Sequence, residues 1–153
     1  MCEFRKRLKE GVVLLDGGMG TMVQDILAPG ENPALLSIRA PEQIEAIHRA
    51  YFQAGADVVY ANTFGAGVLK LEGSGYTTEE ITAASVAAAR RAAAPFNGLV
   101  ALDVGPLGEL LEPLGTLPFD RAVELYARQI QAGVEAGVDL IAIETIMDIY
   151  EAK

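Results

Sequence analysis

Sulfur and imidazole ligands are scarce in this sequence of 153 residues, which has one cysteine and one histidine. A single cysteine, Cys2, excludes an intramolecular disulfide and leaves no Cys-x-x-Cys pair for redox chemistry. Cys2 and the distant His48 do not make a zinc site, which needs several such ligands together. We therefore expect a cytoplasmic protein in which Cys2 is an inert, exposed thiol. We also expect His48 to be a surface or boundary residue of its helix and not a ligand.

Basic residues are also few, because 12 Lys and Arg face 21 Asp and Glu and give a net charge of −9. This sign is wrong for holding a phosphate backbone or an anionic membrane, so nucleic acid and membranes are not expected partners. No apolar run approaches the ~20 residues that span a bilayer. The basic N-terminus is not followed by the apolar region of a secretory signal. Instead, Phe4 and Leu8 lie four residues apart and predict a short amphipathic helix.

What is present is a hydrophobic content of 51%, which is ample for a core. Four short apolar runs are rich in aliphatic and β-branched residues with little polar alternation. This pattern is typical of strands that are buried on both faces of a parallel sheet. The four runs are Val12–Leu15, Asp57–Ala61, Leu99–Leu102 and Val138–Ile143.

Helical patterns separate these runs. A first-turn proline, a capping box or a glycine after the last turn marks where a helix begins or ends. The predicted helices extend from Pro41 to Gly55, from Thr77–Glu80 to Pro95, and from about Phe119 to Gly137. Alanines in the second helix predict close packing on the sheet. Ahead of these helices we expect a short helical stretch near Thr21–Leu27 and a loop over residues 28–40.

Each apolar run ends in a polar residue. These residues are Asp16, Asn62, Asp103 and Glu144, separated by 46, 41 and 41 residues. A repeated βα unit that places one polar group at the same sheet edge favours the α/β class and a TIM (β/α)8 barrel. A doubly wound open sheet is the alternative, but it gathers ligands only near its switch point. Since a barrel takes ~250 residues, we expect residues 1–153 to form about half of one, with roughly four βα units and no second domain.

The turn after the first run, Asp16–Thr21, is rich in glycine. Glycines let the backbone approach a ligand, and the amides of the following helix could hold a carboxylate. A glycine-rich turn without a ligand is the alternative. A flavodoxin-like nucleotide binder is disfavoured, because the glycines match neither GxGxxG nor GxxxxGK[ST] and no lysine follows them.

The other strand ends carry further candidates. Asn62 and Thr63 could donate hydrogen bonds to a substrate, or Asn62 could cap the next segment. Asp103 could orient a neighbouring group as a buried carboxylate. Glu144 faces the site if the register of its strand is right, and it could then meet an ammonium group through a charge-assisted hydrogen bond.

Taken together, four motifs in this order resemble the homocysteine S-methyltransferase family. They are Leu15–Thr21, Ala61–Gly65, Asp103–Gly108 and Gly137–Thr145. The continuation Ile146–Lys153 is most similar to the homocysteine-binding module at the N-terminus of cobalamin-dependent methionine synthase. The likeness extends from about residue 8 to the end of the chain.

The resemblance implies a (β/α)8 barrel that binds homocysteine at the strand carboxyl ends. It implies a zinc ion that makes the thiol a thiolate, which attacks a methyl group on methylcobalamin or another donor. Folate, betaine and S-methylmethionine stay open as donors. The turn formed by Asp16, Gly17, Gly18, Met19 and Gly20 would hold the amino-acid end of homocysteine, with backbone amides of Gly18–Gly20 suited to its carboxylate. Glu144 would receive the ammonium group, and Asn62, Thr63 and Asp103 would support the same face.

The family's three zinc cysteines belong to the second half of the barrel, and no residue here replaces them. We therefore expect no metal ligand in this chain. The leading hypothesis is the N-terminal half of a homocysteine S-methyltransferase barrel that is active once the second half is supplied. Its open sheet edges predict association with a complementary C-terminal half-barrel or with itself. The alternative is a non-catalytic assembly module, or one that binds a small amino acid through Asp16 and Glu144.

Overall fold

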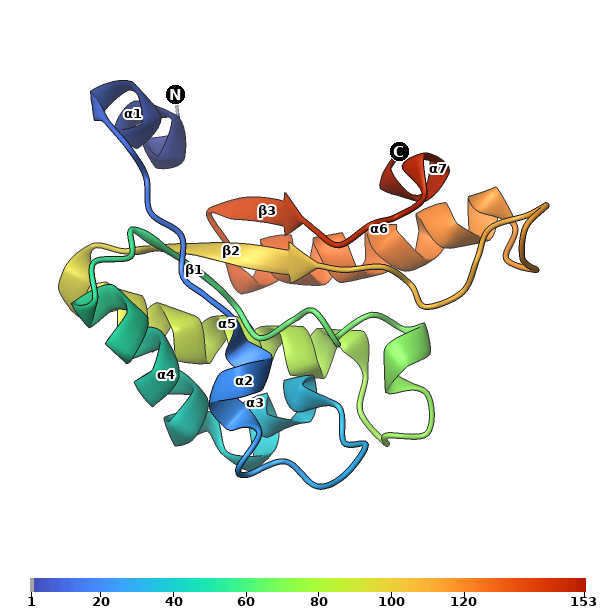
Figure 1. Ribbon diagram of the computed structural model, residues 1–153, viewed down its shortest axis with the longest axis horizontal. Coiled ribbons are helices and arrows are strands. Elements are labelled where there is room, and N and C mark those ends of the chain that lie inside the picture. The colour runs from blue at the N-terminus through green and yellow to red at the C-terminus, as the bar shows by residue number, and fades with distance from the viewer. Residues whose placement is uncertain (1) are drawn as a thin grey trace.

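The structure is a computed structural model that describes residues 2–153 (Figure 1). Met1, the first residue of the expected single unit, lies outside the described residues. Three parallel strands form one sheet in the order β1-β2-β3. Their bounds are β1 Val58–Tyr60, β2 Leu99–Val104 and β3 Leu140–Ile143. Each lies within or overlaps a predicted apolar run, and the expected α/β class with parallel strands is confirmed.

Helices precede and separate the strands in the alternation that the sequence predicts. The longer helices are α1 (Glu3–Glu10), α4 (Pro41–Gln53), α5 (Thr78–Ala93) and α6 (Phe119–Ala136). The short ones are α2 (Met19–Val23), α3 (Leu36–Arg39) and α7 (Ile149–Ala152). Three single turns of 3-10 helix complete the set, namely η1 (Pro33–Leu35), η2 (Leu69–Leu71) and η3 (Ala94–Phe96).

The helix boundaries follow local chemistry. Glu80 N–H donates to Thr77 Oγ1 at 3.2 Å, and Thr77 N–H donates to Glu80 Oε2 at 2.9 Å, so the predicted capping box is present. Gly137 ends α6 with φ of 88°, a left-handed conformation that glycine adopts without strain. The predicted helix starts at Pro41 and Phe119 are confirmed.

The structure corrects the prediction of a first strand over Val12–Leu15. It lies beside β1 but makes a single bridge, between Leu15 and Val58. The Leu14 N–H donates to the Asp57 carboxylate at 2.9 Å instead of to a strand carbonyl. The segment is also bounded by Gly11 and Gly17, so it is too short to pair further. It nevertheless occupies the edge of the sheet where a fourth strand was expected.

The structure also corrects the prediction of a loop over residues 28–40, because this segment contains η1 and α3. The Asn32 side chain accepts from the Ala34 N–H at 3.0 Å and starts η1 just before Pro33. Leu36 and Ser37 are then buried against the rest of the molecule. Tertiary burial here overrides a sequence that is rich in turn residues. The stretch expected near Thr21–Leu27 begins and ends earlier than expected, as α2.

The core lies on both faces of the sheet. On one face, α4, α5 and α6 lie beneath the strands (Figure 1), and Phe52, Val86 and the α5 alanines pack on Val59 and Val100. The predicted close packing of these alanines is confirmed. On the other face, Val58 packs with neighbouring strand residues and with Phe4 of α1. None of the helices described over residues 2–153 has the length and apolar character needed to cross a membrane.

The predicted surface or boundary position of His48 is also wrong. Its side chain is fully buried, not at a surface or boundary, and neither ring nitrogen has a hydrogen-bond partner in the described part of the chain. Ile44, His48 and Phe52 recur every four residues, so they share the buried face of α4. Burial lowers the pKa of His48 to about 4, because the charged ring would lose its hydration. Cys2 is exposed, as expected.

Candidate functional site

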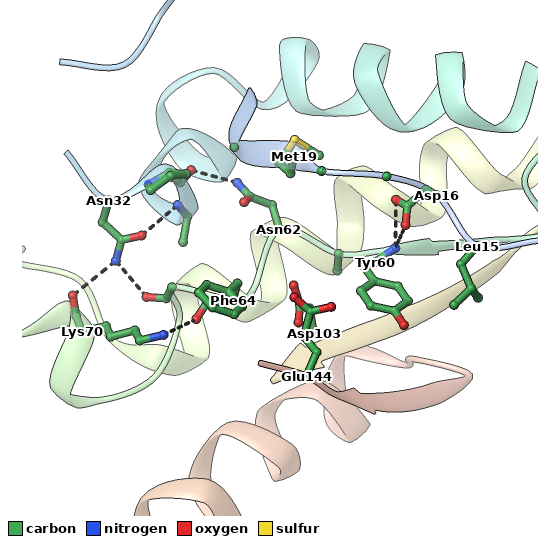
Figure 2. Close-up of a pocket in the computed structure, with 17 residues that line it drawn as sticks. Leu15, Asp16, Met19, Asn32, Tyr60, Asn62, Phe64, Lys70, Asp103 and Glu144 are labelled. Atoms are coloured by element: carbon green, nitrogen blue, oxygen red, sulfur yellow. Dashed lines mark hydrogen bonds between the residues drawn. The ribbon is translucent and has the colours of Figure 1, made fainter. Parts of the chain in front are cut away.

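A cavity of about 810 Å³ opens at the carboxyl ends of the strands. Figure 2 shows its lining residues, which come from the turn after Leu15, from the ends of β1, β2 and β3, and from the segments around η1 and η2. Of the predicted site residues, the structure brings together here Asp16, Gly17, Gly18, Met19, Gly20, Asn62, Asp103 and Glu144. Thr63 is not among the lining residues. The packing of parallel strands therefore gathers residues from 16 to 144 in the sequence at one sheet edge.

Asp16 is anchored to the neighbouring strand. Both of its carboxylate oxygens accept from the Tyr60 N–H, at 3.2 and 3.1 Å. Burial raises the pKa of Asp16 to about 7, an effect that the Tyr60 N–H opposes and the negative charge of Glu144 adds to. Asp16 is thus held in position and close to the midpoint of its titration at neutral pH.

Asp103 lies at the end of β2 and is only 8% exposed. Its backbone is held by Thr63, whose Oγ1 donates to Asp103 O at 2.8 Å and accepts from Asp103 N–H at 2.9 Å. Its side-chain Oδ1 has no hydrogen-bond partner among residues 2–153. Burial raises the pKa of Asp103 to about 7, with Glu144 and Asp16 adding to the effect and Lys70 opposing it. Thr63 therefore positions this strand end through bonds to the backbone, which do not use the carboxyl group.

Glu144 follows β3 and is exposed. Its N–H donates to Val104 O at 3.0 Å, which continues the pairing of β3 with β2 by one residue. The next residue, Thr145, has φ of 60°, so the chain turns sharply after Glu144. The charge of Glu144 raises the pKa of Asp16, of Asp103 and, after the effect of burial, of Tyr60. The three carboxyl groups thus share one electrostatic environment at this end of the cavity.

The glycine turn packs against α4. A Cβ on Gly17 would lie 3.0 Å from Tyr51 Oη, so this position favours glycine by close approach. The Tyr51 hydroxyl donates to Gly18 O at 3.3 Å, and the Thr21 hydroxyl donates to the same oxygen at 3.1 Å. These contacts fix the turn and leave Met19 and Gly20 lining the cavity.

Asn62 lines the cavity and also forms hydrogen bonds that hold neighbouring segments together. Its Nδ2 donates to Pro33 O at 2.8 Å and to Ser37 Oγ at 3.1 Å. The Ser85 hydroxyl donates to Asn62 O at 3.0 Å. Asn62 therefore ties the end of β1 to η1, α3 and α5, and it orders the wall of the cavity.

Sequence reasoning missed three polar residues of the cavity, Tyr60, Lys70 and Asn32. Lys70 Nζ donates to Phe64 O at 3.1 Å and lies 4.1 Å from the centroid of the Phe64 ring. Asn32 Nδ2 donates to Gly65 O at 2.8 Å and to Lys70 O at 3.2 Å, which holds this wall together. A signal for Lys70 was available, since it is the one lysine between residues 10 and 152.

Comparison with known proteins decides the family. The family model described as homocysteine S-methyltransferase matches residues 13–153. This chain belongs to the homocysteine S-methyltransferase family. The resemblance drawn from the four motifs is thereby confirmed, and these motifs contribute most of the cavity lining.

Solved structures of a homocysteine methyltransferase, MmuM from Escherichia coli, are similar to this member of the family. The metallated form superposes with a TM-score of 0.84 at 22% identity, over 97% of this chain and 59% of that chain. The oxidised form gives a TM-score of 0.83 at 26% identity, over 97% and 58%. The apo form gives 0.73 at 26% identity, over 97% and 54%. The chain therefore spans less than two thirds of the length of the MmuM chains.

The zinc ion implied by the family resemblance does not fit the residues present. Within residues 2–153, no three His, Cys, Asp or Glu side chains are placed so that they could hold a metal ion. His48 is buried inside α4, and neither it nor Cys2 lines the cavity. Carboxylates alone are not the usual ligand set of zinc, which takes sulfur and nitrogen. The cavity is lined instead by three carboxyl groups, those of Asp16, Asp103 and Glu144, and by the glycine turn.

Proposed function

We propose that this chain is the N-terminal half of a homocysteine S-methyltransferase barrel, and that it binds the amino-acid end of homocysteine. The observation that carries the proposal is the convergence of Asp16, Asp103 and Glu144 with a glycine turn in one cavity. Membership of the family supports homocysteine as the ligand. Similarity to the MmuM structures over 54–59% of their length supports a partial barrel of the TIM type.

In this proposal each end of the ligand has its own partners. Glu144 receives the ammonium group, with Asp16 nearby, because opposite charges in a partly buried site attract strongly. The amides of Gly18, Met19 and Gly20 receive the carboxylate. Asn62 and Thr63 act indirectly, by ordering the strand ends through the hydrogen bonds described above.

The sulfur end of homocysteine points away from these groups in the proposal. Methyl transfer to it from methylcobalamin, the donor that we propose, then depends on residues that this chain does not supply. Exposed apolar residues along the sheet support association with a complementary half-barrel or with a second copy, since Val12 is 86% and Ile143 is 56% exposed. A folded, monodisperse monomer in sedimentation velocity, unchanged at high protein concentration, would count against self-association.

Isothermal titration with L-homocysteine tests the binding role. The parent chain is expected to bind it saturably, and Glu144→Ala is expected to bind it at least about tenfold more weakly, because one charge-assisted hydrogen bond is lost. Glu109→Gln is the matched control, because it removes an exposed carboxyl outside the cavity and should bind like the parent. Absent binding in the parent, or equal binding by Glu144→Ala, would contradict the assignment.

A non-catalytic amino-acid-binding module is the second candidate. The observation that favours it is the lack of a metal-ligand cluster in the described part of the chain. Addition of methylcobalamin and zinc to the homocysteine complex distinguishes the two candidate functions. Methionine formed only after a complementary half-barrel is supplied supports the methyltransferase. Binding without turnover, even with that half present, supports the module.

A further inference from the structure

Helix α6 has two apolar sides, and the described part of the chain covers only one of them. The buried side contains Ala122, Leu125 and Ala132, and it packs on β2 and α5. A second set of apolar residues recurs every three or four positions, so it forms a stripe along the helix. The stripe consists of Phe119, Val123, Ala127, Ile130 and Val134. Its phenylalanine and both valines are 46–59% exposed, so this side of the helix lacks a protein neighbour among residues 2–153.

The stripe continues onto the edge of the sheet. Leu102 of β2 packs on Gly133 of α6, and Ile141 of β3 pairs in register with Leu102. Ile141 and Ile143 therefore lie on the sheet face that carries α6, but they are exposed whereas Leu102 is fully buried. A groove of about 250 Å³ runs between Ile143, Tyr150 of α7 and the stripe. We call the stripe together with Ile141, Ile143 and Tyr150 the α6–β3 surface.

The total surface of the chain is larger than its mass predicts. Its solvent-accessible area is 8373 Å², whereas a folded monomeric protein of 16.2 kDa exposes about 7500 Å². The difference is roughly 900 Å². A stable protein interface buries about 800 Å² on each partner. The excess is therefore of the size that one interface removes from water.

The edge of β3 can pair with a second copy of itself. β3 is the last strand of the sheet, and no strand of the described chain pairs with its outer side. A two-fold axis perpendicular to the sheet makes the two β3 strands antiparallel neighbours and gives this edge its hydrogen bonds. Helix α6 connects β2 to β3 and lies beneath them (Figure 1). Since strands lie about 4.8 Å apart, α6 and its copy come to lie about 10 Å apart, close to the 8–10 Å at which helices pack.

The order of residues along the stripe suits the same axis. In an antiparallel pair of helices, residues at equal distances from the axis face one another. With Ala127 at the axis, Val123 of one copy meets Ile130 of the other, and Phe119 meets Val134. The small side chain of Ala127 lets the helices approach at the centre, and the larger ones fill the two ends. Ala127 and Ile143 line the same groove, so one axis serves both the helix and the strand.

We propose that the α6–β3 surface is the interface of a symmetric homodimer, in which α6 packs on α6 and β3 pairs with β3. The proposal rests on the partial barrel of the proposed function, which leaves this edge of the sheet open, and it names the second copy as the partner. A complementary half-barrel needs the same edge of β3, so the two partners exclude each other. Because association costs translational freedom and the ordering of side chains, we expect a dissociation constant in the micromolar range.

Sedimentation velocity at protein concentrations from about 1 to about 200 µM measures this association. The parent chain should be monomeric at the lowest concentration, with Ile143 exposed as described, and dimeric at the highest. Val123→Glu places a carboxylate inside the apolar interface and should raise the dissociation constant at least about tenfold. Leu114→Glu is the matched control, because Leu114 is 80% exposed and lies outside the α6–β3 surface. A parent that stays monomeric throughout, or a dimer that Val123→Glu weakens no more than the control does, would overturn the proposal.

A mixture of two variants tests the antiparallel arrangement itself. Ile130→Lys should weaken association as Val123→Glu does, because position 130 faces position 123 of the other copy. In a mixed dimer, the introduced carboxylate meets the introduced ammonium group, while the remaining valine and isoleucine meet as in the parent. An equimolar mixture should therefore dimerise at concentrations at which either variant alone is monomeric. Restored dimers also show that both variants are folded, whereas a mixture that stays monomeric rejects the arrangement.

Two further results separate this proposal from its alternatives. If the parent stays monomeric but binds an added complementary half-barrel, that half is the partner of β3 and the homodimer is rejected. Titration with L-homocysteine reports on the proposed function independently, because the cavity lining includes no residue of the α6–β3 surface. A dimer that does not bind homocysteine supports the interface and rejects the proposed function. A chain that binds homocysteine and stays monomeric does the reverse.

Discussion

The strands β2 and β3 have similar sequences but very different surroundings. All six residues of β2 are buried, whereas Ile141 and Ile143 of β3 are 39% and 56% exposed. The cause is position, because β2 lies between two strands and packs against α5 and α6, while β3 is an edge strand of the described sheet. An apolar run thus predicts a strand, but it does not say which elements cover it.

The same contrast continues at the ends of the two strands. Asp103, near the end of β2, is buried, and Glu144, directly after β3, is exposed, although both line the cavity. The β2 side of the cavity is therefore preorganised, whereas the β3 side is open to solvent or to a partner. Three stability measurements can break or sharpen this comparison.

Truncation of one side chain in each strand should give the largest difference in stability. Leu102 of β2 is fully buried against Gly133 of α6, so Leu102→Ala should lower the free energy of unfolding by about 2–5 kcal/mol, through lost burial and a cavity. Ile143→Ala should cost less than about 1 kcal/mol, because this side chain is already half in water. Urea unfolding measures both. Equal losses would show that β3 is covered in solution, as a dimer would cover it.

His48, on the packed side of the molecule, should contribute a loss of stability in acid. His48 has a pKa of about 4 in the folded state against 6.5 ordinarily, so the unfolded chain binds more protons between these values. Its contribution to stability is therefore complete above pH 6.5 and is lost as the pH falls toward 4, by up to about 3 kcal/mol. His48→Leu should lose this dependence in denaturant titrations from pH 7.5 to 4. A parallel pH dependence in parent and variant would show that His48 is accessible to water.

Removal of helix caps should give the smallest difference. Thr77 caps α5, which packs under β1 and β2, so Thr77→Ala should cost about 1 kcal/mol of unfolding free energy. Asp148 caps α7 by accepting from the Tyr150 N–H at 2.8 Å, but α7 has four residues and none is buried. Asp148→Ala should therefore leave the global transition unchanged and only fray this end. If Asp148→Ala lowered the free energy of unfolding as much as Thr77→Ala does, α7 would unfold together with the rest of the molecule.

Local signals predicted most of the fold. The capping box at Thr77 and the glycine at 137 act within one turn of chain, so they hold whatever the tertiary context. The failures lie where distant groups decide. The Leu14 N–H donates to the Asp57 carboxylate and not to a neighbouring strand. Leu36 is helical and buried in a segment whose sequence predicts a loop.

The candidate site divides in the same way. Asp16, Asp103 and Glu144 could be named from the sequence because each follows an apolar run, and parallel strands bring their ends to one edge. Lys70 and Asn32 follow no strand, and contacts with Phe64 and Gly65 bring them to the cavity. Only a folded chain reveals such residues.

The sequence alone determines where strands and helices alternate, which polar group ends each strand, and that the chain carries no cysteine cluster for a metal. The tertiary structure decides how deeply each of those groups is buried. Asp103 loses water and hydrogen-bond partners because β2 is covered on both sides, while Glu144 keeps water because β3 is an edge. Burial and neighbouring charge set the pKa of a carboxyl group, and both depend on packing between residues that are far apart in the chain.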